Sequence, residues 1–437
     1  MKKLTVLALA CLLSGAFVPS TIQAQQISAI DSVMNHAKGN RLSVGGYGEV
    51  ALTREFFSDN IYRYSKAGQY KNDPSHGRFD IPHAVVYLGY DFGKGWTMGS
   101  EIEFEHGGTG SAYEKEFEES GEWEQEVEKG GEVELEQFWL QKSFLNKKLN
   151  LRVGHIVVPV GLTNSAHEPT NFFTVYRPEG ENTIFPCTWH QTGISLWGRA
   201  GAWKYEVQFL PGLDAMQFSR DNWIQKGAHS AFEFEVANKY ATAVRIDNYS
   251  LPGLRIGLSG YYGNSIDNSY TRDSQGMARK LHGTVIIGSF DFNYHGHNWI
   301  VRGNFDYGHL GDAASIYSLP GRQTRTSPFN QDHVGKEAIA TGAEAGWDCF
   351  SLIRSKHTAD QKFYLFGRYE YYNSYTPANK LSEKNPFTKR HRMALGVNWY
   401  PIKQIVVKGE YSKRFLNKQY NNEPSLSIGI AYEGFFL

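Results

Sequence analysis

Residues 149–157 read Leu-Asn-Leu-Arg-Val-Gly-His-Ile-Val, and residues 191–199 read Gln-Thr-Gly-Ile-Ser-Leu-Trp-Gly-Arg. In both segments apolar and polar side chains alternate, which is the period of a β-strand with one apolar face. Residues 158–189 lie between them and contain four prolines. We therefore expect two neighbouring strands of a sheet, joined by a long loop with several prolines that is the best place in the chain for function.

The same alternation begins near residue 41 and continues to the end of the chain. In the first segment Leu42, Val50 and Leu52 share one face, whereas Tyr47 and Glu49 lie on the other. Counting such segments predicts sixteen strands, joined alternately by short turns and long polar loops. The long loops are expected at residues 54–78, 107–131, 158–189, 211–240, 263–280, 311–337, 376–388 and 416–424.

This arrangement of strands favours a closed barrel that crosses a membrane. After residue 24 the sequence has no apolar run of the roughly 20 residues that a membrane-spanning helix needs. A closed antiparallel barrel satisfies every backbone hydrogen bond in lipid without such a run. Trp96, Trp299 and Tyr400 stand beside short turns, where we expect an aromatic girdle. The predicted fold class is all-β, a sixteen-stranded antiparallel transmembrane β-barrel, with a soluble propeller or sandwich as the alternative.

The N-terminus has the character of a secretory signal peptide. Lys2 and Lys3 precede an apolar run, and Ala24 ends a small-residue cleavage site. We expect residues 1–24 to be the signal peptide, residues 25–40 a short periplasmic helical segment, and residues 41–437 the barrel. A signal peptide followed by a transmembrane barrel predicts the bacterial outer membrane.

Composition and motifs give little support for chemistry. The chain has 437 residues and a formal net charge of zero, so nucleic acid is not an expected partner. His295 and His297 lie in a turn without a Cys or carboxylate at metal-ligand spacing, and no phosphate loop or nucleophile elbow is present. We expect no enzyme activity, cofactor or metal. A barrel enzyme assembled from distant strands, or a surface adhesin, remains the alternative.

Charged residues stand opposite the apolar face of many strands and are expected to line a channel. Two interpretations stay open: ordinary interior charges offset by neighbouring acids, or a basic rim that attracts anions. The basic residues expected to line the channel are Arg152, Lys204, Arg255, Arg302, Arg368, Arg392 and Lys408.

An acidic stretch runs from Glu114 to Glu136, with eleven Glu and two Lys. A solvated outer loop is the simplest interpretation of such a charge run. Bridging by divalent cations is the alternative, although no calcium-loop spacing is present.

The loop and its flanking strands resemble the phosphate-selective porin O and P family, and most closely its Bacteroidetes members. The resemblance rests on the strand end Gly154-His-Ile-Val-Val-Pro159-Val-Gly161-Leu162 and on the motif 193–198, Gly-Ile-Ser-Leu-Trp-Gly. It implies a sixteen-stranded homotrimer whose third long loop folds inward and narrows the channel. The loop residues expected at this constriction are Pro159, Glu168, Arg177, Glu179 and Glu181.

One position departs from the family pattern. Val157 stands where the family has a Lys, and Arg177 is the only Lys or Arg between residues 158 and 189. We therefore expect a porin that passes small hydrophilic solutes with a weak preference for anions, phosphate among them, and that contacts outer-membrane lipid.

Overall fold

The computed structural model describes residues 41–437 with several gaps. The expected signal peptide and the helical segment at residues 25–40 lie outside the described residues. The positions left out within the range are 61, 71, 107–109, 117–123, 131–132, 187, 229–234, 269–280, 317–318, 320–332, 354, 356–357, 359 and 379–386.

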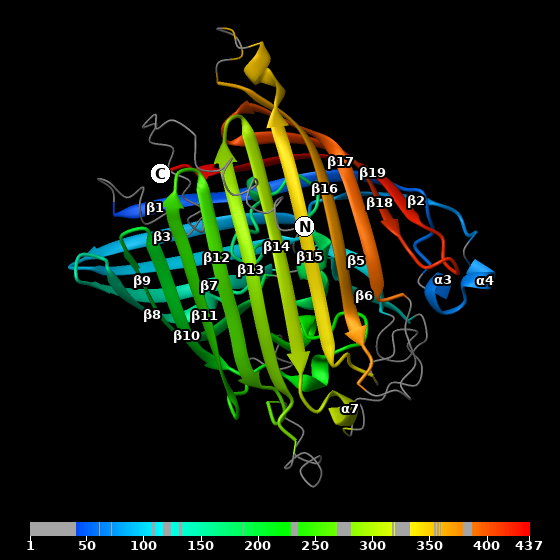
Figure 1. Ribbon diagram of the computed structural model, residues 1–437, viewed down its shortest axis with the longest axis horizontal. Helices are drawn as coiled ribbons and strands as arrows, with labels where there is room; N and C mark the ends of the chain where they lie inside the picture. The colour runs from blue at the N-terminus through cyan, green and yellow to red at the C-terminus, as the bar shows by residue number, and fades with distance from the viewer. Residues whose placement is uncertain are drawn as a thin grey trace, which may run out of the picture.

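The described residues form one closed antiparallel sheet, in which each long strand pairs with the next along the chain (Figure 1). The last strand pairs with the first, with Tyr432 opposite Gly48, so the sheet has no free edge. Its seventeen strands are one short strand, β2, and sixteen long ones, which confirms the predicted sixteen-stranded barrel. The long strands are β1 (Leu42–Glu55), β3 (His83–Gly93), β4 (Trp96–Glu105), β7 (Val133–Phe144), β8 (Leu149–Val157), β9 (His190–Ala200), β10 (Trp203–Pro211), β11 (Tyr240–Leu251), β12 (Leu254–Asn264), β13 (Thr284–Gly296), β14 (Trp299–Leu310), β15 (Glu337–Asp348), β16 (Lys362–Thr376), β17 (Lys389–Ile402), β18 (Ile405–Phe415) and β19 (Glu423–Phe435).

Short elements lie in the connections between these strands. The strand β2 (His76–Asp80) pairs with the second half of β1, whereas the first half of β1 pairs with β3. The strands β5 (Gly110–Glu116) and β6 (Glu124–Gly130) form a separate hairpin that overlaps the acidic stretch. The helices are α3 (Tyr62–Ser65), α4 (Ala67–Tyr70), η1 (Pro169–Asn171), α5 (Glu179–Ile184), η2 (Ala215–Gln217), η3 (Gln225–Ala228), α7 (Ala313–Ile316) and η5 (Cys349–Leu352). None of the helices in the described part of the chain is long and apolar enough to cross a membrane.

The two faces of the wall differ as the alternation predicts. Leu258 on β12 points outward with 55% of its surface exposed, while Ser259 beside it is buried inside. Trp96 and Trp299 are exposed next to short turns, as a girdle requires. Tyr400 does not belong to that girdle, because it alternates with exposed Trp399 and packs edge-on against buried Tyr364.

Two loops fill much of the barrel interior. The first is the constriction loop, residues 158–189, in which Val160, Phe173 and Ile184 are almost fully buried. This confirms the predicted inward-folded third loop. The second loop follows β10. Its fully buried side chains Phe218 and Trp223 pack in one apolar core with Val160 and Ile184. Its inward path was not predicted.

Candidate functional site

The constriction loop begins with a sharp turn at Gly161, which has a φ of 85°. The carboxylate of Glu181 accepts hydrogen bonds from the backbone N–H groups of Leu162 at 2.7 Å and of Thr163 at 2.6 Å. A Cβ atom at Gly161 would lie 2.6 Å from Glu181 Oε1. Glycine is therefore needed both for the backbone conformation and for the close approach of Glu181.

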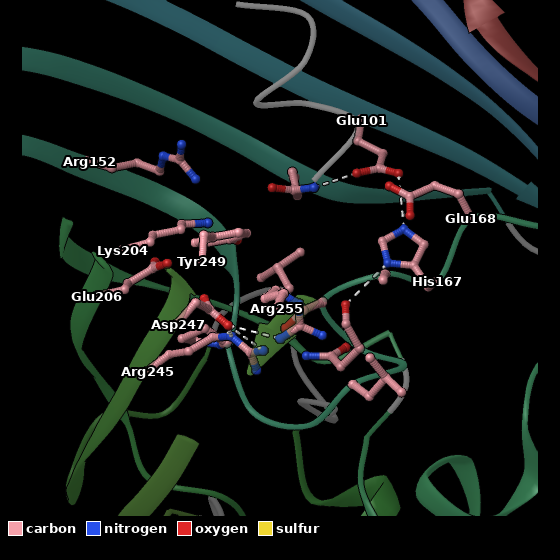
Figure 2. Close-up of a pocket in the computed structure, with 17 residues that line it drawn as sticks. Glu101, Arg152, His167, Glu168, Lys204, Glu206, Arg245, Asp247, Tyr249 and Arg255 are labelled. Carbon is pink, nitrogen blue, oxygen red and sulfur yellow. Dashed lines mark hydrogen bonds and ion pairs between the residues drawn. The ribbon is translucent and has the colours of Figure 1, made fainter. Parts of the chain in front are cut away.

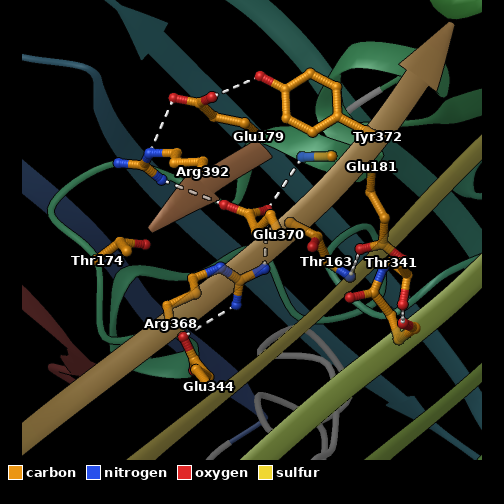
Figure 3. Close-up of polar contacts among 12 residues, drawn as sticks. Thr163, Thr174, Glu179, Glu181, Thr341, Glu344, Arg368, Glu370, Tyr372 and Arg392 are labelled. Carbon is orange, nitrogen blue, oxygen red and sulfur yellow. Dashed lines mark hydrogen bonds and ion pairs between the residues drawn. The ribbon is translucent and has the colours of Figure 1, made fainter. Parts of the chain in front are cut away.

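A row of ion pairs, in which Arg and Glu alternate, holds the part of the loop around Val175 and Gly180 to the barrel wall (Figure 3). We call this row the anchoring belt. It consists of Arg302, Glu344, Arg368, Glu370, Arg392 and Glu410, with N–O distances of 2.7 to 3.3 Å. Its carboxylates also accept hydrogen bonds from the loop backbone, Glu370 from Gly180 N at 3.1 Å and Glu410 from Val175 N at 2.9 Å. The belt therefore neutralises its own charges and supplies acceptors to buried N–H groups that would otherwise be unsatisfied.

Side chains beside the belt add further attachments. Lys408 Nζ donates to Thr174 O at 2.8 Å, and Tyr372 Oη donates to Glu179 Oε2 at 2.8 Å. Arg414 forms an ion pair with Glu179 Oε1 at 2.7 Å. Burial alone would raise the pKa of Glu179, but the guanidinium groups of Arg392 and Arg414 outweigh burial and hold this pKa below its ordinary value.

Arg177 attaches the opposite part of the loop to β1. Its Nη2 donates to Tyr47 Oη at 3.0 Å and lies 3.7 Å from Glu103 Oε1. Its Nε donates to His167 O at 3.3 Å, which joins two parts of the loop. The guanidinium is buried, so this charge serves the packing of the loop against the wall.

An open cavity with about 750 Å³ of free space, part of it continuous with solvent, lies between the start of the constriction loop and the barrel wall (Figure 2). Four basic residues line it from the wall, Arg152 on β8, Lys204 on β10, Arg245 on β11 and Arg255 on β12. Figure 2 shows this group on one side of the cavity, with Glu101, His167 and Glu168 on the other. We call the first side the basic wall, which also carries Glu206 and Asp247, and the second side the acidic wall.

The basic residues of the basic wall are held by two different kinds of contact. Arg245 and Arg255 share the carboxylates of Asp247 and Asp291 at 2.5 to 3.0 Å, which forms a compact four-residue network. The guanidinium of Arg152 lies over an aromatic ring, 4.2 Å from the centroid of Trp139, and its Nε donates to Gln141 Oε1 at 3.2 Å.

The structure divides the predicted site residues into two groups. The residues that line the cavity are Pro159, Glu168, Arg152, Lys204 and Arg255. The others hold the constriction loop to the wall or to itself: Arg177, Glu179, Glu181, Arg302, Arg368, Arg392 and Lys408. The predicted channel-lining residues are therefore divided between the wall of the cavity and the attachment of the constriction loop.

Several cavity residues were missed by the sequence analysis. Arg245 and Asp247 lie on the inward face of β11, so the alternation around Val244 was a sufficient signal for both. His167 and Glu101 come from segments far apart in the chain, and no spacing rule joins them. Two groups of side chains have the donor types and proximity of metal ligands, namely His83 with Glu103 and Glu105, and His167 with Glu101 and Glu136.

Comparisons with known proteins agree with this architecture. The chain is 26% identical over 386 residues to an uncharacterized protein of Aquifex aeolicus strain VF5, covering 87% of this chain and 78% of that protein. Its fold resembles a loop L8 deletion mutant of OmpT, an outer membrane protein of Vibrio cholerae, with a TM-score of 0.51, 10% identity, and coverage of 90% of this chain and 100% of that one. The outer membrane channel DcaP of Acinetobacter baumannii matches with a TM-score of 0.48, 9% identity, and coverage of 90% and 97%.

No protein-family model matches the sequence. At 10% identity the resemblance to OmpT shows a shared barrel fold and carries no residue roles to this chain. Membership of the phosphate-selective porin family therefore stays a prediction from the sequence.

Proposed function

We propose that this protein is an outer-membrane porin that lets small hydrophilic solutes diffuse down their gradients, with a weak preference for anions. The cavity inside the closed barrel is the observation that carries the proposal. It lies beside an inward-folded loop and is lined by charged side chains of both signs. Such a polar cavity beside a narrowed interior suits hydrated solutes, and passive diffusion needs neither a cofactor nor an energy source.

Phosphate selection has weaker support. Val157, which stands where the resembling family has a Lys, lines the cavity itself. Its side chain has no donor for a phosphate oxygen. Arg245 and Arg255 are already engaged by Asp247 and Asp291. We therefore expect anions in general to be favoured slightly, without a dedicated phosphate site.

Single-channel recording in a planar bilayer tests the proposal. Purified protein should insert in discrete steps and give a linear current–voltage relation over moderate voltages. A folded barrel that gives no steps would contradict the channel and favour an enzyme or a surface adhesin on the same fold.

The resemblance in sequence also leads us to propose a homotrimer. Native mass spectrometry in mild detergent should show three chains per particle, and unheated electrophoresis should show a slowly migrating band. A monomer in both measurements would contradict the trimer and leave the channel proposal intact.

A further inference from the structure

Three side chains with metal-binding groups meet where the constriction loop approaches the wall. Glu101 comes from β4, Glu136 from β7 and His167 from the loop, and one ligating atom of each lies within 4.8 Å of the others. The exposed fractions of the three residues are only 1%, 1% and 4%. Three distant parts of the chain therefore present nitrogen and oxygen donors to one buried point.

One buried atom of each side chain has no hydrogen-bond partner. These atoms are Glu101 Oε1, Glu136 Oε2 and His167 Nε2. Buried polar groups in folded proteins are nearly always satisfied, so three unsatisfied atoms in one place indicate a missing ligand.

The remaining atoms of two of these side chains are already held. Gln137 Nε2 donates to Glu101 Oε2, and His167 Nδ1 lies 3.2 Å from Asn164 O. A carbonyl oxygen only accepts, so Nδ1 carries a proton in this contact, which directs Nε2 toward Glu101 Oε1, 3.6 Å away. A ligating histidine is commonly oriented by such a hydrogen bond from its other nitrogen.

The charges around Glu101 and Glu136 also favour a bound cation. Within the part of the chain that the structure describes, no Lys or Arg forms an ion pair with Glu101 or Glu136; the nearby guanidinium of Arg177 pairs with Glu103. Glu101 contacts the imidazole of His167, which is positive only when protonated, and burying two carboxylates is costly because burial removes their hydration. A cation at this point would offset both carboxylates.

We propose that Glu101, Glu136 and His167 bind a divalent transition-metal ion such as Zn²⁺. Zinc takes imidazole nitrogen at about 2.0–2.1 Å and carboxylate oxygen at about 2.0–2.2 Å, which places tetrahedral ligands about 3.4 Å apart. The 3.6 Å between His167 Nε2 and Glu101 Oε1 is close to this spacing. Calcium and magnesium prefer all-oxygen sites, so the imidazole favours a transition metal.

The cavity supplies a path and an open position for the ion. Glu101 and His167 both line it, so an ion can arrive from the aqueous side and keep a water molecule there (Figure 2). Bound metal would join the loop to β4 and β7 and would place positive charge on the acidic wall. Only this effect on permeation rests on the proposed channel function; the binding itself does not.

Zinc binding by the untagged, chelator-treated barrel in detergent tests the proposal. We expect one Zn²⁺ per chain by titration calorimetry and metal analysis. His167→Gln and Glu136→Gln should each weaken binding at least tenfold. His83→Gln removes the histidine of the other acidic group and is the matched control, which should bind as the unaltered protein does.

Spectroscopy of the unaltered protein gives a readout that does not depend on whether the variants fold. Zinc X-ray absorption should show one imidazole nitrogen among oxygen ligands, and Co²⁺ should give absorption bands of a four-coordinate site. A zinc shell without imidazole, or equal binding by His167→Gln, Glu136→Gln and His83→Gln, would overturn the proposal. Because no membrane is involved, these results are independent of any failure to conduct.

Discussion

At the scale of single residues, the direction of a side chain decides whether it meets lipid or the crowded interior. Leu258 and Ser259 are neighbours on β12, yet the first is exposed on the outer wall and the second accepts a hydrogen bond from Gly161 N at 3.1 Å. The alternation in the sequence was enough to assign both directions. It could not identify partners, because Gly161 reaches Ser259 only once the constriction loop has folded inward.

Leu258→Arg should lower the free energy of unfolding by roughly 2–4 kcal/mol, because it places a charge in the middle of the lipid-facing band. Tyr249→Arg, at a residue that lines the cavity, should cost far less. Equilibrium unfolding in urea from lipid vesicles measures both. Equal losses at the two positions would contradict the assignment of the faces.

Glycine at position 346 makes room for the constriction loop. A Cβ atom there would lie 2.2 Å from Phe173 Cζ, and Phe173 is held by stacking on Phe366. Gly346→Ala should therefore destabilise the barrel by about 1–3 kcal/mol through overpacking. Gly288→Ala is the control, since nothing lies within 4 Å of its added carbon. The same unfolding measurement should separate the two, and similar values would show that Phe173 moves aside freely.

At the scale of elements, the strands were predictable and the loops were only partly so. Period-two alternation follows from each strand's own neighbours and needs no knowledge of the rest of the chain. The inward path of the constriction loop came from a family resemblance, not from periodicity. The loop after β10 was missed, although Phe218 and Trp223 in a loop are an apolar signal, because a loop shows no period to interpret.

Glu179 offers a test of how the constriction loop is fixed. Glu179→Gln removes the negative charge shared by Arg392 and Arg414, and should cost about 1–3 kcal/mol. Hydrogen exchange across residues 179–184 should become faster in the variant. Asp267→Asn breaks the half-exposed pair with Lys239 at 3.6 Å and should cost no more than about 1 kcal/mol.

The effect of Glu179→Gln should depend on pH in one direction. The pKa of Glu179 is lowered in the folded protein, so its stabilisation is complete above the ordinary carboxyl pKa of 4.5 and is lost progressively as the pH falls below it. The difference between the unaltered protein and the variant should be constant near neutral pH and shrink in acid. A difference that grows in acid would contradict the ion-pair role.

At the scale of the whole molecule, charge is divided between the outer connections and the interior. The sequence of the acidic stretch is strongly negative, and β5 and β6 pair with each other in a sheet separate from that of the barrel wall. Many interior charges pair with one another, as in the anchoring belt. Alternation along each strand was enough to predict their signs and inward direction, whereas the pairing that cancels them depends on how distant strands are aligned.

Selectivity between anions and cations should therefore depend on the charges that line the cavity and not on those of the hairpin formed by β5 and β6. Fields from solvated charges decay over about 8 Å at physiological salt, whereas charges in a narrow interior are screened less. Arg152→Gln combined with Lys204→Gln should shift the zero-current potential in a KCl gradient toward cations, because both side chains line the cavity. Deleting residues 110–130 should change it little. A strong preference for K⁺ in the unaltered channel, or a reversal on deleting the hairpin, would show that the outer charges control permeation.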